Sequence, residues 1–388
     1  MLFSLALILI CGFLLSGIME KLKLPGLLGM LLTGIILGPY VFNLISPEIL
    51  NISADLREIA LIVILTRAGL AIDIKDLKKV GRPAVLMCFV PATFELIAVT
   101  VLAPKFFLVS YIEAAIMGAV LAAVSPAVVV PRMLNLMKGG YGISKGIPGL
   151  IMAGASVDDI YVIVLFTSFI EMWKGSGFDL INLADIPISS ILGLGVGICA
   201  GLVLIQIFKK IHMRDTVKIL IIFSASFLFV SLEAVIKMSG LLAVMALGGT
   251  ILKQNKSLAQ RLSTKFSKIW VGAEILLFVI VGAAVNISYL KNAGFMAVLM
   301  ILFALIFRVC GVFVSLIKTE LTLKEKLFCA IAYLPKATVQ AAIGSIPIAA
   351  GSAAGDTILT VAVLAIVITA PLGALGIDST YKKLLSDE

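Results

Sequence analysis

The 388-residue sequence has few of the side chains on which metal sites and hydrolytic active sites depend. Its one histidine, His212, lies in a basic stretch, which argues against a histidine-based zinc site and a Ser-His-Asp triad. The five cysteines are scattered through apolar runs without Cys-x-x-Cys spacing, and this pattern predicts packing residues. We therefore expect neither an enzyme active site nor a cofactor. The cysteines are Cys11, Cys88, Cys199, Cys310 and Cys329.

Charged residues are also scarce, at 14%, against 61% hydrophobic residues and a mean hydropathy of +1.17. Such a composition cannot cover a water-exposed surface, and no stretch is left for a soluble domain. What the chain has instead is a series of apolar runs, each long enough for a helix to cross a hydrocarbon core about 30 Å thick. Thirteen membrane-spanning helices are predicted, at about 2–18, 26–45, 57–72, 83–104, 111–131, 148–172, 187–208, 216–236, 239–253, 269–287, 294–317, 327–348 and 357–377.

The net charge of +9 has a simple explanation in how lysine and arginine are distributed. Loops after odd-numbered spans, together with the C-terminal tail, hold 23 of the 31 basic residues, and loops after even-numbered spans hold five. By the positive-inside rule, this predicts a multi-pass protein of the plasma or inner membrane with its N-terminus outside and its C-terminus in the cytoplasm. The basic excess orients the chain, so we expect no nucleic-acid partner. No basic residue precedes the first span, so no cleavable signal peptide is expected.

Five charged residues lie inside predicted spans, and two of them, Asp158 and Asp159, are neighbours. The others are Glu95, Arg308 and Lys336. A charge at the bilayer centre costs at least about 2.5–3.5 kcal/mol, so five of them indicate function. The alternative is that they only neutralise each other between helices. That alternative is strong for Glu95 with Arg308 and weak for two adjacent carboxylates, which repel each other.

The five charges sum to minus one, because three carboxylates face two cations. One unmatched carboxylate in a low-dielectric interior takes up either a proton or a small cation. Competition between these two ions for one site is the physical basis of exchange.

Proline residues predict breaks in two of the spans. Pro126 and Pro131 lie in the fifth span, and Pro335 directly precedes Lys336 in the twelfth. An interior proline removes a helix hydrogen bond and often breaks the helix. Two interrupted spans seven apart point in opposite directions, which favours an inverted repeat with a binding site at the breaks. Spans 1–6 and 8–13 are then the two halves.

A glycine-rich stretch, Gly193 to Gly201, superficially suggests a nucleotide-binding loop. It lies inside a predicted span, where small residues allow close helix packing, so we expect no nucleotide.

Four stretches resemble the monovalent cation:proton antiporter superfamily, in its NhaA- and NapA-like branch, and most closely the NHA-type sodium/proton exchangers. The stretches are "LTRAGL" at 65–70, "AVSPAVVVP" at 123–131, "GGYGISKGIPGLIMAGASVDD" at 139–159 and "LPKATVQAAIG" at 334–344. The resemblance implies an all-α antiporter fold with two crossing broken helices, embedded in the lipid bilayer. It also implies a transport core at about 83–172 and 294–377, a scaffold that forms a homodimer at about 1–72 and 216–287, and a linker helix at about 187–208.

The resemblance also implies roles for individual residues. Asp159 is expected to be the main carboxylate for Na⁺ or Li⁺ and for the proton, with Asp158 as a further ligand or an ion-pair partner. Arg308 stands where many electrogenic members have a lysine that pairs with the first aspartate, and a glutamate such as Glu95 is expected to engage it. The remaining supporting residues are expected at the two breaks: Lys336 and Thr338 at one, Ser125 at the other.

The function favoured by these patterns is antiport of Na⁺ or Li⁺ against H⁺ by alternating access, with a role in pH homeostasis. The alternatives are a K⁺/H⁺ antiporter, a sodium-coupled symporter of an organic solute, and an ion channel. If Glu95 occupies the permanently charged Arg308, then Asp158, Asp159 and Lys336 sum to minus one. One Na⁺ or one H⁺ restores neutrality, which favours electroneutral exchange. A cycle with two protons per cation needs a second proton on Asp158 or Lys336.

Overall fold

The computed structural model describes residues 1–71, 81–175, 182–236, 238–285 and 287–386. Within these ranges the chain is helical and no β-strand is present, which confirms the all-α prediction. Lys75, Lys78 and Lys79, which are among the basic residues counted in the loop after the third span, lie outside the described ranges.

Nine helices in the described part of the chain are long and apolar enough to cross a membrane. They coincide with nine predicted spans, and three shorter apolar helices coincide with three more: Gly26–Leu37, Gly240–Gln254 and Thr338–Ala349. The remaining predicted span, 57–72, is covered by the helix Ser53–Ala71, whose several charged residues make it less apolar. The multi-pass architecture is thus confirmed, whereas the number thirteen and the inverted repeat stay predictions. The nine helices are Leu2–Lys21, Arg82–Phe107, Tyr111–Lys138, Ile147–Lys174, Ile191–Lys210, Asp215–Glu233, Lys256–Ala283, Gly294–Ser315 and Gly355–Leu384.

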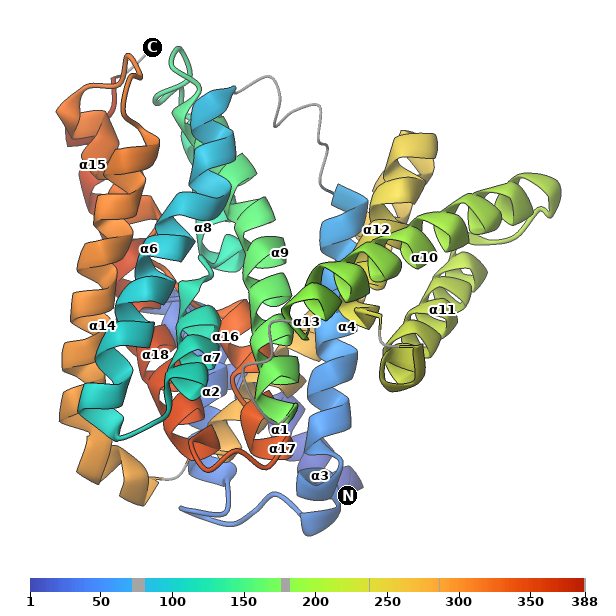
Figure 1. Cartoon of the computed structure of the whole chain (residues 1–388), viewed down its shortest axis with the longest axis horizontal. Coiled ribbons are helices and arrows are strands. Elements are labelled where there is room, and N and C mark those ends of the chain that lie inside the picture. The colour runs from blue at the N-terminus through green and yellow to red at the C-terminus, as the bar shows by residue number, and fades with distance from the viewer. Residues whose placement is uncertain (72–80, 176–181, 237, 286, 387–388) are drawn as a thin grey trace. The chain divides into compact units, whose positions relative to one another are not determined.

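The chain divides into two compact units, the first of which lies within Met1–Ala54, Lys75–Ile170 and Ile275–Glu388. In this unit α6 packs along both α7 and α14, and α18 contacts α7, α8, α14, α15 and α16 (Figure 1). All five charged residues predicted inside spans belong to this unit. Its helices are α1 (Leu2–Lys21), α2 (Gly26–Leu37), α3 (Pro47–Asn51), α6 (Arg82–Phe107), α7 (Tyr111–Ala122), α8 (Pro126–Lys138), α9 (Ile147–Lys174, as far as Ile170), the second part of α13 (Lys256–Ala283, from Ile275), α14 (Ile287–Ser315), α15 (Leu323–Ala332), α16 (Thr338–Ile343), α17 (Ile346–Ala349) and α18 (Gly355–Leu384).

The second unit lies within Asp55–Ile74 and Glu171–Glu274, and in it α12 packs against α10 and α11. Its helices are α4 (Ser53–Ala71), α10 (Asn182–Lys210), α11 (Asp215–Ile236), α12 (Gly240–Gln254) and the first part of α13 (Lys256–Ala283). The tenth span was predicted at about 269–287, and residues 269–283 form the second part of α13, a continuous helix that begins at Lys256. The basic residues at the start of α13 alternate with buried apolar ones, Leu258, Leu262 and Phe266 among them, which makes the segment helical although its average hydropathy is low.

The fifth predicted span is broken where Pro126 begins α8. α7 ends at Ala122, and the connecting residues Ala123 and Ser125 are extended, at φ −70°, ψ 142° and φ −87°, ψ 107°. Proline fits the first position of a helix and disfavours a helical residue before it, which accounts for the break. The helix then continues past Pro131 to Lys138, further than the predicted end of the span.

The twelfth predicted span is broken between Ala332, the last residue of α15, and Thr338, the first residue of α16. Pro335 lies within this break and Lys336 follows it. The two breaks contact each other directly, because the Ser125 N–H donates to the Pro335 carbonyl at 2.8 Å. Both predicted breaks therefore exist, and they meet in the first unit.

Candidate functional site

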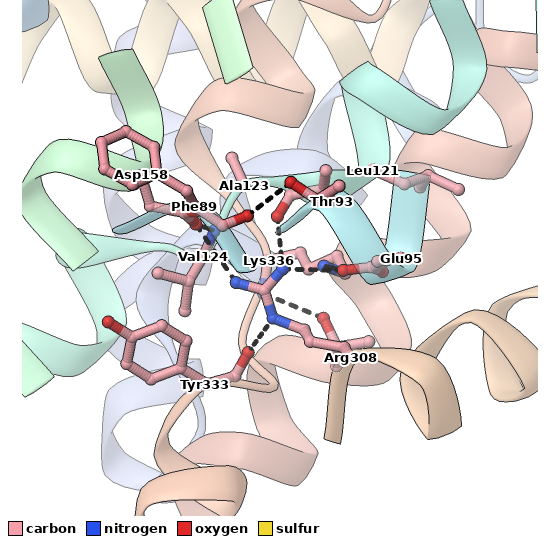
Figure 2. Close-up of polar contacts among 12 residues, drawn as sticks. Phe89, Thr93, Glu95, Leu121, Ala123, Val124, Asp158, Arg308, Tyr333 and Lys336 are labelled. Carbon is pink, nitrogen blue, oxygen red and sulfur yellow. Dashed lines mark hydrogen bonds and ion pairs between the residues drawn. The ribbon is translucent and has the colours of Figure 1, made fainter. Parts of the chain in front are cut away.

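Four of the five charged residues form a continuous chain of ion pairs beside the two breaks (Figure 2). Lys336 Nζ lies 2.8 Å from Glu95 Oε2, the same oxygen lies 2.7 Å from an Arg308 guanidinium nitrogen, and the other terminal nitrogen of Arg308 lies 3.2 Å from Asp158 Oδ2. All four side chains are buried, none more than 1% exposed. Two carboxylates and two cations make this cluster neutral, and we call it the paired cluster.

Asp159 adjoins the paired cluster but is not part of it. Its side chain is 8% exposed, and its buried Oδ1 has no hydrogen-bond partner among the residues that the structure describes. Successive helix residues point about 100° apart, so Asp158 turns toward Arg308 and Asp159 toward a different side of α9. Asp159 is therefore the one carboxylate of the sequence count that has no ion pair among the described residues.

Arg308 also binds backbone carbonyls at the ends of two helices. It donates to the Ala122 carbonyl at the end of α7 and, through Nε, to the Tyr333 carbonyl just beyond α15 at 2.5 Å. The last carbonyls of a helix lack intrahelical donors and carry partial negative charge. One guanidinium thus satisfies two helix ends and two carboxylates, which fixes the first break relative to the second.

Further hydrogen bonds hold the backbone of each break. Asp158 Oδ2 accepts the Val124 N–H at 2.7 Å, and the Lys336 N–H donates to Thr369 Oγ1 of α18 at 2.9 Å. Backbone groups freed by a broken helix need such partners, since an unpaired buried N–H is costly.

Five buried side-chain oxygens near the breaks have no hydrogen-bond partner within the described residues: Ser125 Oγ, Asp158 Oδ1, Asp159 Oδ1, Tyr333 Oη and Thr338 Oγ1. Ser125 precedes α8 and Thr338 is the first residue of α16, as predicted for the two breaks. Hydroxyl and carboxylate oxygens are hard ligands, of the kind that alkali and alkaline-earth cations prefer. These oxygens are therefore of a type suited to a small, hard cation.

The structure places Lys336 differently from the charge count made on the sequence. That count grouped Lys336 with the two aspartates, whereas its ammonium contacts Glu95. The expected Glu95–Arg308 contact is present, but Arg308 also contacts Asp158. Glu95 thus lies between two cations, and Asp158 is held by the arginine.

Sequence reasoning missed three residues that shape the site: Tyr333, Gln340 and Thr369. Gln340 and Thr369 are buried polar residues in apolar spans, and Gln340 follows Lys336 by four positions, a signal that could have identified it. Tyr333 packs its hydroxyl against Gly154, where an added Cβ would lie 1.8 Å from the phenol oxygen. Nothing in the sequence pattern indicates that contact.

A family model described as "Sodium/hydrogen exchanger, transmembrane" matches residues 5–383 of the chain. The chain is 32% identical to sodium/hydrogen exchanger 9B2 of Homo sapiens over 414 residues, covering 99% of this chain and 75% of the human protein. It is 36% identical over 371 residues to sodium/hydrogen exchanger 9B2 of Mus musculus, covering 91% and 67%. It is 34% identical over 382 residues to sodium/hydrogen exchanger 9B1 of Homo sapiens, covering 94% and 73%.

The fold is similar to that of a solved protein. The structure of the sodium proton antiporter MjNhaP1 from Methanocaldococcus jannaschii at pH 8 superimposes with a TM-score of 0.83 at 22% sequence identity, covering 98% of this chain and 97% of the other. An electron-microscopy map of MjNhaP1 gives a TM-score of 0.72 at 23% identity.

Proposed function

We propose that this chain, which belongs to the transmembrane sodium/hydrogen exchanger family, exchanges Na⁺ or Li⁺ for H⁺ at Asp159. Family membership makes it a cation/proton antiporter of a multi-pass membrane type, and not an enzyme. The identity of the site, the ion and the stoichiometry are our proposals, and the residues that support them all lie in the first unit.

The observation that carries the proposal is the difference between Asp159 and its charged neighbours. The paired cluster is neutral, and each of its members has an ion-pair partner. Asp159 carries a negative charge with no ion pair to any residue that the structure describes, and it is slightly exposed. In a low-dielectric interior that charge requires a counter-ion, and a proton and a small cation compete for it.

The ligands proposed for the cation are the unpartnered oxygens of Asp159, Asp158, Ser125 and Thr338. The two hydroxyl groups stand at the N-terminal ends of the broken helices α8 and α16. Discontinuous helices of transporters build their ion sites from such residues. A proton on Asp159 neutralises the carboxylate that the cation requires, so the proton and the cation exclude each other.

The charge arrangement favours exchange of one cation for one proton. Asp159 carries the one surplus charge, so either ion brings the site to neutrality and the loaded core crosses the membrane in the same charge state. A cycle of two protons per cation requires a second proton on Asp158 or Lys336. A change of protonation on either residue would disrupt an ion pair of the paired cluster, because Lys336 is hydrogen-bonded to Glu95 and Asp158 to Arg308.

We further propose that transport occurs by alternating access in a homodimer of the plasma or inner membrane, with the N-terminus outside and the C-terminus in the cytoplasm. The transport core comprises about residues 83–172 and 294–377, which include both breaks, the paired cluster and Asp159. The scaffold comprises about residues 1–72 and 216–287, with a linker helix at about 187–208. The excess of lysine and arginine in alternate loops supports this orientation.

The experiment that tests the proposal is exchange in proteoliposomes that contain the purified full chain and a trapped pH-sensitive dye. Addition of Na⁺ or Li⁺ to one side is expected to drive saturable proton movement in the opposite direction without any organic solute. Proton movement driven only by K⁺ would make the protein a K⁺/H⁺ antiporter. A requirement for an organic solute would indicate symport, and non-saturating flux without coupling would indicate a channel.

A further inference from the structure

Gln340 is a fully buried residue of α16 that takes no part in the paired cluster and has no assigned role. It lies in the stretch "LPKATVQAAIG", one helical turn beyond Lys336. Its side chain connects the two broken helices. Its amide oxygen accepts the Ala337 N–H at 2.8 Å, and its amide nitrogen donates to the Ala123 carbonyl at 2.9 Å and to the Leu121 carbonyl at 3.4 Å.

The orientation of this amide follows from its partners. The Ala337 N–H only donates, and the carbonyls of Leu121 and Ala123 only accept. In a flipped amide, the NH₂ group would face the Ala337 N–H and the oxygen would face the two carbonyls, so none of these contacts would be a hydrogen bond. The amide oxygen therefore stabilises the N-terminal end of α16, as the third residue of a helix does in half of a capping box. The amide nitrogen satisfies carbonyls where α7 ends.

Together with Arg308, this amide provides donors to three successive carbonyls at the end of α7. Gln340 donates to Leu121 and Ala123, and Arg308 donates to Ala122 between them. Carbonyls at the unwound ends of broken helices are backbone groups through which transporters commonly bind their ions. Here each has given one lone pair to a protein donor, whereas the hydroxyl oxygens of Ser125 and Thr338 have given none within the described residues.

We propose that Gln340 is a specificity-determining residue that keeps the α7 carbonyls out of the coordination sphere of the transported cation. The inference rests on the proposed exchange function and concerns which cation is preferred. With these carbonyls engaged, the cation meets a small set of hydroxyl and carboxylate oxygens, which suits Na⁺ or Li⁺. Loss of the amide nitrogen frees the Leu121 and Ala123 carbonyls to join the ligands of the cation. A larger number of carbonyl ligands favours K⁺.

The test compares the full-length wild type with Gln340→Met in proteoliposomes, with Na⁺, Li⁺ and K⁺ as driving ions. Methionine has a similar length and no amide donor. We expect the ratio of kcat/KM for K⁺ to that for Na⁺ to rise about tenfold, mostly through KM, corresponding to about 1.4 kcal/mol. A ratio within twofold of the wild-type value would overturn the inference.

A matched control separates selectivity from loosening of the core. Ile343→Ala removes a fully buried side chain from the same short helix without touching the three hydrogen bonds. It is expected to lower the thermal midpoint and the rate while leaving the K⁺ to Na⁺ ratio unchanged. An equal rise of the ratio in both variants would mean general loosening and would refute the role of the amide.

If Gln340→Met does not accumulate as folded protein, Gln340→Leu takes its place, since it also lacks the amide donor and brings no charge into the buried site. The ratio is expected to rise in the same direction, and an unchanged ratio contradicts the inference. Wild-type protein without any cation-driven proton movement would overturn the proposed function itself. That outcome differs from an active wild type whose selectivity is insensitive to residue 340.

Discussion

The two carboxylates at the middle of α9 are adjacent in sequence but lie in different electrostatic surroundings. Asp158 accepts hydrogen bonds from Arg308 and from the Val124 N–H and is fully buried. Asp159 is 8% exposed and has no ion pair among the described residues. Asp158 thus holds the broken helices together, whereas Asp159 makes no such contact within the described part of the chain and is the carboxylate that we propose as the exchange site.

The same division extends to the cations. Arg308 and Lys336 both contact Glu95, so neither is available to neutralise Asp159. A buried ion pair is weak evidence for stability by itself, because desolvation offsets the attraction. It does, however, fix geometry, and here it fixes the two breaks beside the residue that is proposed to exchange ions.

The largest expected effect is on transport by Asp159→Asn. The substitution removes the one carboxylate among the five charged residues that lies outside the ion pairs of the paired cluster, so cation-driven proton movement should fall to the level of empty liposomes. Because Asp159 has no structural partner in the described part of the chain, the thermal midpoint in detergent should stay close to that of the wild type. Exchange at wild-type rates in this variant would remove Asp159 from the site.

The second effect is on stability, and it concerns the paired cluster. Removing one partner of a buried ion pair typically costs about 3–5 kcal/mol, so Arg308→Ala and Glu95→Ala should both unfold at lower temperature. Arg308→Ala should be the more damaging, since it also deprives the Ala122 and Tyr333 carbonyls of their donor. A double variant no less stable than Arg308→Ala alone would show coupling, whereas strict additivity would contradict the pairing.

A smaller effect is expected from Asp158→Asn. The amide retains an acceptor for the Val124 N–H, but the cluster gains a net positive charge beside Asp159. Cation affinity should fall about tenfold, or about 1.4 kcal/mol, with exchange still measurable. The apparent KM for Na⁺ of the variant and of the wild type, measured in the proteoliposome assay, tests this expected fall in affinity. Complete loss of exchange, equal to that of Asp159→Asn, would mean that both carboxylates carry the ion.

The smallest effect concerns an ion pair outside the spans, between Lys145 and Glu325 at 2.9 Å. Burial raises the pKa of Glu325, but the hydrogen bonds from the Thr322 N–H and the Lys145 ammonium outweigh it, so the pKa lies below its usual value. A lowered pKa stabilises the fold above the unfolded-state pKa of about 4.3, and this contribution is lost as pH falls through the folded-state pKa.

Lys145 is partly exposed, so Glu325→Gln should cost no more than about 1 kcal/mol at neutral pH. The stability difference from the wild type should shrink as pH falls below about 4, where both proteins carry a neutral side chain. Thermal midpoints of the two proteins across that pH range would show it. A difference that is independent of pH would mean that the carboxylate charge has no part in it.

Much of the site could be predicted from the sequence because its signals are local. Pro126 and Pro335 marked the two breaks, and charged residues inside apolar runs marked the cluster. The partner of Lys336 could not be predicted, because Glu95 is 241 positions away and only the folded contact between α6 and the second break joins them. Average hydropathy alone does not place the start of α13 at Lys256, because the first part of this helix alternates basic residues with buried apolar ones.

The central claim is that one surplus charge, on Asp159, is exchanged between a cation and a proton while the paired cluster stays neutral. The most direct test imposes a potassium diffusion potential with valinomycin on sodium-loaded proteoliposomes and follows proton exchange. Transfer of one net charge is worth about 2.3 kcal/mol per 100 mV, so an electrogenic cycle responds strongly to voltage. For electroneutral exchange, we expect the rate and the final pH gradient to be unchanged by the potential. A final pH gradient that shifts with voltage would contradict it, and would assign a second proton to Asp158 or Lys336.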